Sequence, residues 1–395
     1  MFRNQCLICQ KTNRFQKLID FGFTPWSNNF VKKKKRVKEY PLTLVKCPNC
    51  LSVQLNYFVK KEIMFLKHDY VTGVNSELKI HFKKIVKNLL LKKTKSSNVL
   101  DIGSNDGTFL KNFPKQFKKF GFEPCKEIIV KDRSIKTVKK FFSYEESKKI
   151  KINFDIIHAS GVFFHLEELH SVTKGIKYLL KTDGVFVIQF LYLKDIIEKC
   201  HFDQIYHEHL VYYTISSLNI ILNSYDLEIF DIFKSEIHGG SLVAHVGHKG
   251  LKNKTKRYKT LFEEDIHFIR NFNEKISIFK KKINFLNARI NKFILLNKKK
   301  NNRIIGLGAP AKASTLLKVF NLNKNKIDFC LEINKKKIGS YLPNTQIVIK
   351  NQNNFKIKKN DCFIFFSWNF KKSIIQNFLN KNKKKITIFN PHIDA

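Results

Sequence analysis

One short segment restricts the possible folds of this chain more than any other, and it reads Val99-Leu100-Asp101-Ile102-Gly103-Ser104-Asn105-Asp106-Gly107-Thr108. Its apolar start predicts a strand, and the glycines after it predict a tight turn that leads into a helix, which is the geometry of a nucleotide-cofactor site. The glycine spacing is G-x-x-x-G and not the G-x-G-x-x-G of dinucleotide-binding folds. The segment therefore predicts an α/β domain that holds a cofactor at its glycine turn.

The acidic residues around this turn indicate which cofactor it holds. Asp101 and Asp106 would repel a pyrophosphate, but they suit the cationic amino group of S-adenosylmethionine. Twenty residues after Gly103, the next predicted strand ends at Glu123, where a carboxylate can hold the hydroxyl pair of a ribose. We therefore expect an S-adenosylmethionine site, and its candidate residues are Asp101, Gly103, Asn105, Gly107 and Glu123.

Predicted strands and helices alternate on both sides of this turn. A helix is expected at Ser76–Lys93, where apolar residues recur at helical spacing. Further strands are expected at Phe120–Glu123, Phe154–Ser160, Val185–Phe190, Leu227–Phe233 and Leu242–Val246. The stretch Thr255–Leu296 contains neither Pro nor Gly and predicts one long helix, after which a second βα unit begins at Arg303–Leu307. This alternation predicts a mostly parallel sheet that is covered on both faces.

Four cysteines near the N-terminus give the clearest metal signal. They form two C-x-x-C pairs, and each pair can aim two thiolates at one tetrahedral Zn²⁺: Cys6 with Cys9, and Cys47 with Cys50. The 37 residues between the pairs exceed the usual spacing of a zinc ribbon, so a small lobe must fold between them. Four thiolates leave no open position, which favours a structural over a catalytic zinc. The alternative is a set of unrelated reduced cysteines.

A polar segment with proton-transfer chemistry follows the strand at Val185–Phe190, on the side where α/β sheets bind ligands. It runs Phe202-Asp203-Gln204-Ile205-Tyr206-His207-Glu208-His209-Leu210. Buried His, Tyr and Glu side chains each require a hydrogen-bond partner, so their density here is costly in a plain core. An imidazole can act as a base near neutral pH, with neighbours that orient it. The alternatives are a polar loop or a second metal site.

A second turn made of small residues joins a strand to a helix at Ile305-Gly306-Leu307-Gly308-Ala309-Pro310-Ala311-Lys312. Free backbone N–H groups at such a turn can hold an anion, and Lys312 could meet a substrate phosphate. Close packing of a helix on a strand explains the glycines equally well.

The net charge of +42 suggests nucleic-acid binding, but the lysines are spread along the chain rather than gathered on one module. Abundant Lys, Asn, Ile and Phe together indicate a general preference for AT-rich codons. No stretch approaches the roughly 18 apolar residues of a membrane-spanning helix, and the first residues do not resemble a signal peptide. We therefore expect a cytoplasmic protein with reduced cysteines, acting as a monomer without a nucleic-acid or membrane partner.

Several unusual strings give the whole chain a resemblance to the sugar C-methyltransferases, which act on nucleotide-linked keto-deoxysugars. Besides the cysteine pairs and the two glycine turns, the strings are Tyr40-Pro41-Leu42, Val53-Gln54-Leu55, Asp203-Gln204-Ile205-Tyr206-His207-Glu208-His209, His238-Gly239-Gly240-Ser241-Leu242 and Gly339-Ser340-Tyr341-Leu342-Pro343. Two positions depart from the family pattern: Val243 stands where Arg is frequent, and Leu331-Glu332-Ile333-Asn334 stands where paired acids and Pro are frequent.

The resemblance implies a fold and a set of roles. The fold would be α/β, with a zinc-binding lobe at 1–75, a class I methyltransferase domain of Rossmann-like architecture at 76–250, a helical connection at 251–300 and a C-terminal Rossmann-like domain at 301–395. His209 resembles the general base that removes the proton beside the sugar ketone. Its polar surroundings would be Tyr206, Glu208, His165 and Tyr70, and the nucleotide sugar would be held by Gly308, Lys312 and His238.

Two other functions remain open at this point. An O- or N-methyltransferase on another small metabolite would use the same scaffold, but it would depend little on His209. A nucleic-acid-directed methyltransferase or binder would bind RNA or DNA with strong salt dependence.

Overall fold

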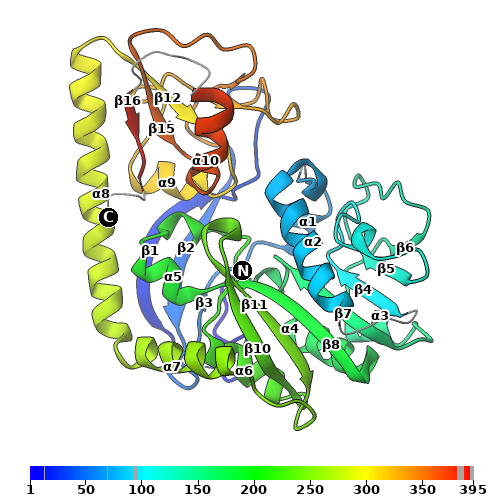
Figure 1. Cartoon of the computed structure of the whole chain (residues 1–395). Helices are drawn as coiled ribbons and strands as arrows, with labels where there is room; N and C mark the ends of the chain where they lie inside the picture. Colours follow the sequence, from blue (N-terminus) through cyan, green and yellow to red (C-terminus); the bar gives the residue numbers. More distant parts are fainter. Residues whose placement is uncertain (13, 69, 92–96, 380–386, 392–395) are drawn as a thin grey trace.

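Three β-sheets form the framework of the chain (Figure 1), in a computed structural model that describes residues 1–395 except 13, 69, 92–96, 380–386 and 392–395. The first sheet is antiparallel and has the order β1-β2-β3-β9. Its strands are β1 (Gln16–Pro25), β2 (Glu39–Lys46), β3 (Val53–Leu55) and β9 (Val211–Tyr212). The strand β9 begins two residues after His209, so the polar segment of the central domain leads directly into the edge of the N-terminal sheet.

The central sheet has 7 strands in the order β10-β11-β8-β7-β4-β5-β6. They are β4 (Asn98–Ile102), β5 (Lys118–Phe122), β6 (Ile135–Val138), β7 (Phe154–Ser160), β8 (Leu180–Leu191), β10 (Leu227–Ser235) and β11 (Ser241–His248). The strand β11 runs antiparallel to both of its neighbours, and the other pairs are parallel. Six of the seven residues of β7 are buried, which fits a sheet covered on both faces.

Short helices connect these strands. They are α1 (Lys61–Phe65), η1 (Thr72–Val74), α2 (Ser76–Leu90), η2 (Leu110–Asn112), α3 (Tyr144–Ser147), η3 (Phe163–His165), α4 (Leu169–Leu179), α5 (Leu193–Glu198), η4 (Phe202–Gln204), α6 (Ile215–Asn223) and η5 (Ile237–Gly239). The helix α2 begins where the Asn75 side chain accepts a hydrogen bond from Leu78 N, and its predicted end at Lys93 lies outside the described residues. The helix expected after Gly107 is only the three-residue turn η2, because Pro114 follows closely and disfavours helix in the residue before it.

The predicted long helix Thr255–Leu296 is two helices, α7 (Lys256–Arg270) and α8 (Phe272–Lys299). The break falls at Asn271, whose side-chain amide donates to the carbonyl of His267 at 3.0 Å and so competes with continued helix. Thr255 lies outside the helix and caps it, accepting a hydrogen bond from Tyr258 N. Figure 1 shows α8 (yellow) running along one side of the molecule from α7 to the C-terminal sheet.

The C-terminal sheet has 5 parallel strands in the order β14-β13-β12-β15-β16. The strands are β12 (Arg303–Leu307), β13 (Phe329–Glu332), β14 (Ile349–Asn351), β15 (Asp361–Phe365) and β16 (Thr387–Phe389). The helical elements of this part are α9 (Ala313–Val319), η6 (Trp368–Phe370), α10 (Lys371–Ile374) and the π-helix η7 (Ile375–Leu379). The four sequence ranges proposed as domains stay a prediction.

One buried carboxylate of α7 makes several hydrogen bonds to the central domain. Asp265 accepts hydrogen bonds from Tyr192 Oη, from Ser216 Oγ and from the backbone N–H groups of Ile215 and Ser216 at the start of α6. The donors lie at the starts of α5 and α6, about 50 to 70 residues before Asp265 in the sequence. Asp265 therefore holds α5, α6 and α7 together.

Replacing Asp265 by Ala is therefore expected to lower the free energy of unfolding by roughly 3 kcal/mol, because buried donors lose their acceptor. Urea unfolding followed by circular dichroism measures the change. Glu263→Ala, at an exposed position of the same helix, is the matched control. A loss below about 1 kcal/mol in Asp265→Ala would show that water replaces the carboxylate without cost.

None of the described helices combines the length and the apolar character needed to cross a bilayer.

Candidate active site

The N-terminal, central and C-terminal parts of the chain all line one cavity of about 1130 Å³. It is lined by residues from the N-terminal loop before β2, from the carboxyl ends of the central strands and from the turn after β12. Most of the predicted site residues lie in its wall: Tyr70, Gly103, Asn105, Glu123, His165, Tyr206, Glu208, His209, Gly308 and Lys312. Asp101 and Gly107 are outside this wall, and the side chain of His238 lies outside the described residues.

The predicted cofactor turn follows β4 directly. The N–H groups of Gly103 and Ser104 both donate to Phe122 O at 2.9 Å, which joins the turn to the end of β5. Gly103 has a φ of +73°, and a Cβ there would lie 2.5 Å from Val162 Cγ2, so a larger residue would not fit. The carboxylate of Glu123 accepts from Asn105 N at 3.0 Å and from Cys125 N at 2.8 Å. Burial raises the pKa of Glu123.

Asp101 faces away from the cavity. Successive side chains of a strand point to opposite faces, and Ile102 is the one that lines the cavity. Asp101 instead lies in the core, where its carboxylate is 2.7 Å from His158 Nδ1, and the His158 ring stacks on Phe109. Gly107 also faces away from the cavity, since a Cβ there would meet the buried side chain of Ile135. Asp101 and Gly107 therefore support the turn from the side opposite the cavity, and they do not line the cavity.

Asn105 links the cofactor turn to the loop that carries Tyr70. Its Oδ1 accepts a hydrogen bond from Thr72 N at 2.8 Å, and its Nδ2 donates to Tyr70 O at 3.1 Å. The Tyr70 side chain is 49% exposed and lines the cavity. These two hydrogen bonds join the turn to this loop.

His209 is held in one orientation by its own segment. Its Nδ1 lies 2.7 Å from the carbonyl of Gln204. A carbonyl oxygen can only accept, so Nδ1 carries the proton and, in the neutral ring, the lone pair is on Nε2. The Tyr206 ring lies 4.0 Å from the His209 ring, and Phe164 contacts it edge-on. In this orientation the basic nitrogen of the neutral ring is Nε2.

His165 supports the same segment from η3. Its Nδ1 bonds to the carbonyl of Glu208, and its ring centroid is 5.2 Å from that of His209. Burial lowers the pKa of His165 to about 4, so this ring is neutral at physiological pH. His165 is thus a neutral neighbour of His209 rather than a second positive charge.

Glu208 and Tyr206 supply groups that can donate a proton. Burial raises the pKa of Glu208 to about 7, against the opposing effects of the Asn28 hydrogen bond and the Lys337 charge. Asn28 Nδ2 donates to Glu208 Oε1 at 2.7 Å across 180 positions of sequence. Burial holds the pKa of Tyr206 well above its usual value of about 10, so the phenol stays protonated.

The raised pKa of Glu208 predicts a pH-dependent stability. The folded state holds the proton more tightly than the unfolded chain, so the stabilisation is complete below about pH 4.5 and is lost as the pH rises through about 7. Glu208→Gln removes the titration, and we expect the variant to become more stable than the wild type with rising pH, by about 3 kcal/mol at pH 8. Urea unfolding from pH 5 to pH 8 measures this difference. A difference that stays constant over that range would contradict the raised pKa.

The turn after β12 brings Gly308 and Lys312 into the cavity wall. Gly308 has a φ of +83°, and a Cβ there would lie 2.0 Å from Ser367 Oγ. The Lys312 ammonium is buried, lies 3.5 Å from the centre of the Trp368 ring and is 3.7 Å from Asp203 Oδ2. Burial lowers the pKa of Lys312 to about 8. Asp203 also accepts from Trp368 Nε1 at 2.7 Å, which ties the polar segment to the C-terminal domain.

Two residues that the sequence does not mark as site residues also line the cavity, and they are Asn28 and Glu332. Asn28 lies in an irregular stretch between β1 and β2, where no pattern marks it. Glu332 lies at the end of β13, and Glu123 directly follows the end of β5. The same rule that marks Glu123 in the sequence could therefore also have marked Glu332.

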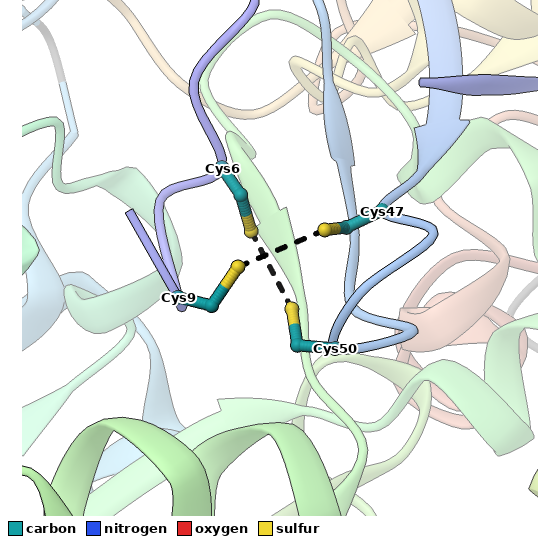
Figure 2. Close-up of side chains that lie close together, drawn as sticks. All are labelled: Cys6, Cys9, Cys47 and Cys50. Atoms are coloured by element: carbon teal, nitrogen blue, oxygen red, sulfur yellow. Dashed lines mark hydrogen bonds between the residues drawn. The ribbon is translucent and has the colours of Figure 1, made fainter. Parts of the chain in front are cut away.

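The four N-terminal thiols converge on one point (Figure 2). Cys6 Sγ is 3.5 Å from Cys50 Sγ, and Cys9 Sγ is 3.8 Å from Cys47 Sγ. With Zn–S bonds of about 2.3 Å, the edge of a regular ZnS₄ tetrahedron is about 3.8 Å. The observed spacing therefore fits one Zn²⁺ with four protein ligands and no open position.

The two C-x-x-C pairs fold in the same way. Gln10 and Leu51, the residues after the second cysteine of each pair, both have a φ near +57°. Each donates its N–H to the carbonyl of the first cysteine of its pair at 3.0 Å. Two equivalent turns thus face each other, as a structural zinc site requires.

Three family models match successive parts of the chain. They are described as a putative zinc binding domain, at residues 6–65, a methyltransferase domain, at residues 75–232, and a C-methyltransferase C-terminal domain, at residues 236–389. The predicted fold class is confirmed, and so are the two predicted cofactors, S-adenosylmethionine and Zn²⁺.

Known proteins match the chain over different lengths. C-methyltransferase NovU of Streptomyces niveus is 25% identical over 391 residues, covering 95% of this chain and 92% of its own. The tRNA U34 carboxymethyltransferase of Campylobacter lari is 29% identical over 120 residues, covering 27% of this chain and 39% of its own. A solved S-adenosylmethionine-dependent methyltransferase of Clostridium acetobutylicum is 14% identical, with a TM-score of 0.36, and covers 43% of this chain and 91% of that one.

The three family models follow one another along the chain in the order of its three sheets, and the match to a C-methyltransferase extends over nearly all of it. Over nearly its whole length the chain is similar to a C-methyltransferase, and it is an S-adenosylmethionine-dependent methyltransferase.

Proposed function

We propose that the protein methylates a carbon next to the ketone of a nucleotide-activated keto-deoxysugar. The observation that carries the proposal is the orientation of His209, whose Nδ1 donates to Gln204 O and whose Nε2 therefore holds the lone pair. A methyl group moves to oxygen or nitrogen through an existing lone pair, whereas carbon must first be deprotonated. An imidazole that is held in one orientation in the cavity wall suits the second reaction.

The reaction needs a base and a group that stabilises negative charge. His209 Nε2 takes the proton from the carbon beside the ketone, and the electrons of that C–H bond become the enolate. Tyr206, a protonated phenol in the same wall, donates a hydrogen bond to the developing oxyanion. Bound S-adenosylmethionine supplies the methyl group as a sulfonium. Held by Gly103, Asn105 and Glu123, this cofactor would give its methyl to the enolate carbon and leave as S-adenosylhomocysteine.

The remaining site residues position the two ligands. Gly103 and Asn105 form the turn against the cofactor, and Glu123 accepts hydrogen bonds from its ribose. Tyr70 closes the cavity from the loop that Asn105 holds. Gly308 and Lys312 face the nucleotide part of the substrate, where the ammonium complements phosphate charge.

Deuterium exchange tests the proposal without depending on methyl transfer. The wild-type protein, saturated with S-adenosylhomocysteine, is incubated in D₂O with a panel of nucleotide 4-keto-6-deoxysugars. We expect mass spectrometry to show one deuterium gained at the carbon beside the ketone for at least one member. If no member exchanges although the cofactor product binds, the substrate class is wrong and an O- or N-methyl acceptor becomes the better explanation.

A further inference from the structure

The irregular loop at 26–31, between β1 and β2, is fixed to the C-terminal part of the chain at two points. Ser27 Oγ lies 2.7 Å from Ser314 Oγ of α9, and both side chains are buried. Further along the loop, Val31 forms an isolated antiparallel bridge with Tyr341, whose N–H donates to Val31 O at 2.8 Å. These contacts lie on either side of the middle of the loop, so both of its ends are held against the C-terminal domain.

The helix α9 also holds the polar segment of the central domain. Thr315, the next residue of α9, donates its hydroxyl to Ile205 O at 2.7 Å, and this hydrogen bond is buried. Two consecutive hydroxyl groups of one helix therefore hold the 26–31 loop and the polar segment beside each other. In this arrangement Asn28 Nδ2 donates to Glu208 Oε1 at 2.7 Å. The contact thus follows from the packing of three parts of the chain.

The contact decides which oxygen of Glu208 carries a proton. The N–H group of an amide can only donate, so Oε1 is the accepting oxygen, and in the neutral carboxyl group the proton lies on Oε2. Glu208 lines the cavity, and among the described residues Asn28 is the one that forms a hydrogen bond with its carboxyl group. Oε2 is therefore left for a ligand in the cavity.

The titratable side chains that act on this carboxyl group, among the described residues, are those of Lys337 and Tyr206. Burial raises the pKa of Glu208 to about 7, while the Asn28 hydrogen bond and the charge of Lys337, from the loop after β13, oppose this rise. The Tyr206 phenol stays protonated, because burial holds its pKa well above the usual value of about 10. Glu208 can therefore hold its proton up to neutral pH.

We propose that Asn28 is a positioning residue for methyl transfer, and that it turns Glu208 so that the hydrogen on Oε2 forms a hydrogen bond to the ketone oxygen of the substrate. The proposal deepens the proposed function and rests on it, since that oxygen gains negative charge only when the neighbouring carbon is deprotonated. Glu208 would be a second donor to this oxygen, beside Tyr206. Without Asn28, either carboxyl oxygen could carry the proton, and some molecules would present a lone pair to the substrate instead.

A double-mutant cycle tests whether Asn28 acts through Glu208. Asn28→Leu removes the donor at a similar volume, and we expect transfer from labelled S-adenosylmethionine to a nucleotide 4-keto-6-deoxysugar to fall roughly 10- to 100-fold. In a Glu208→Ala background the same change should cost less than about threefold, because the partner is already absent. Asn29→Leu, in the same loop but outside the cavity wall, is the matched control and should keep the wild-type rate. If Asn28→Leu costs the same factor in both backgrounds, the proposal is wrong.

The pH dependence of the rate is a measurement that a purely structural role would not change. The wild-type rate should fall as the pH rises through about 7, where Glu208 loses the proton that it donates. Glu208→Gln should remove this fall and keep at least about one tenth of the rate, because its amide accepts from Asn28 and donates from Nε2 in the same way. In Asn28→Leu the fall should move to higher pH, since the lost hydrogen bond had lowered the pKa. A Glu208→Gln variant that keeps the wild-type fall would overturn the role of this proton.

A titration without substrate separates a failure of this proposal from a failure of the proposed function. The protein is labelled with ¹³C at its glutamate carboxyl groups and saturated with S-adenosylhomocysteine, and the NMR signal of Glu208 is assigned by its absence in Glu208→Gln. We expect this signal to titrate at higher pH in Asn28→Leu than in the wild type. Equal titration in the two proteins would show that Asn28 does not hold the carboxyl group, whereas an absence of deuterium exchange would instead overturn the proposed function.

Discussion

Replacing His209 by Gln is expected to lower the rate of methyl transfer by roughly 10²- to 10⁴-fold, the range that a positioned general base contributes. Glutamine fills a similar volume and keeps an amide that can donate to the Gln204 carbonyl, but it has no lone pair basic enough to take a proton from carbon. The proton-transfer step should fail while the cavity keeps its shape. The slower methyl transfer would then be due to the missing base and not to a changed shape of the cavity.

Two measurements on the same variant make this specific. Single-turnover transfer from isotope-labelled S-adenosylmethionine and deuterium exchange beside the ketone should fall together, because both begin with the same deprotonation. Binding of S-adenosylhomocysteine by calorimetry should stay within about threefold, since Gly103 and Glu123 are unchanged. His267→Gln, at an exposed position of α7, serves as the control. If transfer by His209→Gln remains above one tenth of the wild-type rate, another group is the base.

His209, the proposed base, lies beside one histidine that stays neutral and one carboxyl group that titrates near pH 7. Burial keeps His165 uncharged, with a pKa of about 4, so it does not repel a proton on the neighbouring ring. Glu208, with a pKa of about 7, can change its charge in the range where the reaction runs. Asn28 fixes the orientation of that carboxyl from the N-terminal loop. Neither His165 nor Glu208 therefore places a permanent positive charge beside His209.

The sequence predicted the strands around this site better than the ends of its helices and the contacts between its loops. The strands β7, β8 and β12 were expected within a few residues of where they lie, because apolar runs bounded by turn residues mark buried strands. The break at Asn271 was missed, since an amide that bonds back to the preceding turn interrupts a helix without any glycine or proline.

Strand alternation explains why only part of the cofactor motif reaches the cavity. Asp101 and Ile102 are adjacent, and a strand sends them to opposite faces, so only one of them can line the site. That rule could have been applied to the sequence. No such rule places Asn28 beside Glu208, because loop residues meet across the fold only after the sheets have packed.

The polar segment is built by the whole chain. From the C-terminal side, Trp368 binds Asp203, and the Thr315 hydroxyl donates to the Ile205 carbonyl at 2.7 Å. From the N-terminal side, His207 Nε2 lies 3.2 Å from the carbonyl of Pro41. Further contact comes through β9, which pairs with β3 directly after the segment. The arrangement of the polar segment therefore depends on the folding of the N-terminal lobe.

This dependence gives the zinc site a large expected effect. Changing Cys50 to Ser should remove the metal and unfold the N-terminal lobe, because Zn²⁺ contributes roughly 10 kcal/mol or more to the folding of small zinc domains. The strand β3 begins three residues after Cys50, and its buried Val53 and Leu55 belong to the hydrophobic cluster that continues into the central domain. Without the folded lobe, Asn28 and Pro41 no longer hold the polar segment, and methyl transfer should be lost. The central sheet should stay folded and still bind S-adenosylhomocysteine.

Metal analysis, hydrogen exchange and the methyl-transfer assay, made on one preparation, separate these effects. Metal analysis should give one zinc per chain for the wild type and none for Cys50→Ser, and hydrogen exchange should become fast at 16–55 but not in β7 and β8. Cys362→Ser, which changes a cysteine of the C-terminal sheet outside the zinc cluster, should keep the metal. If Cys50→Ser loses its zinc yet 16–55 stays protected and transfer continues, the lobe folds on its hydrophobic contacts alone, and the metal is not what holds the catalytic segment in place.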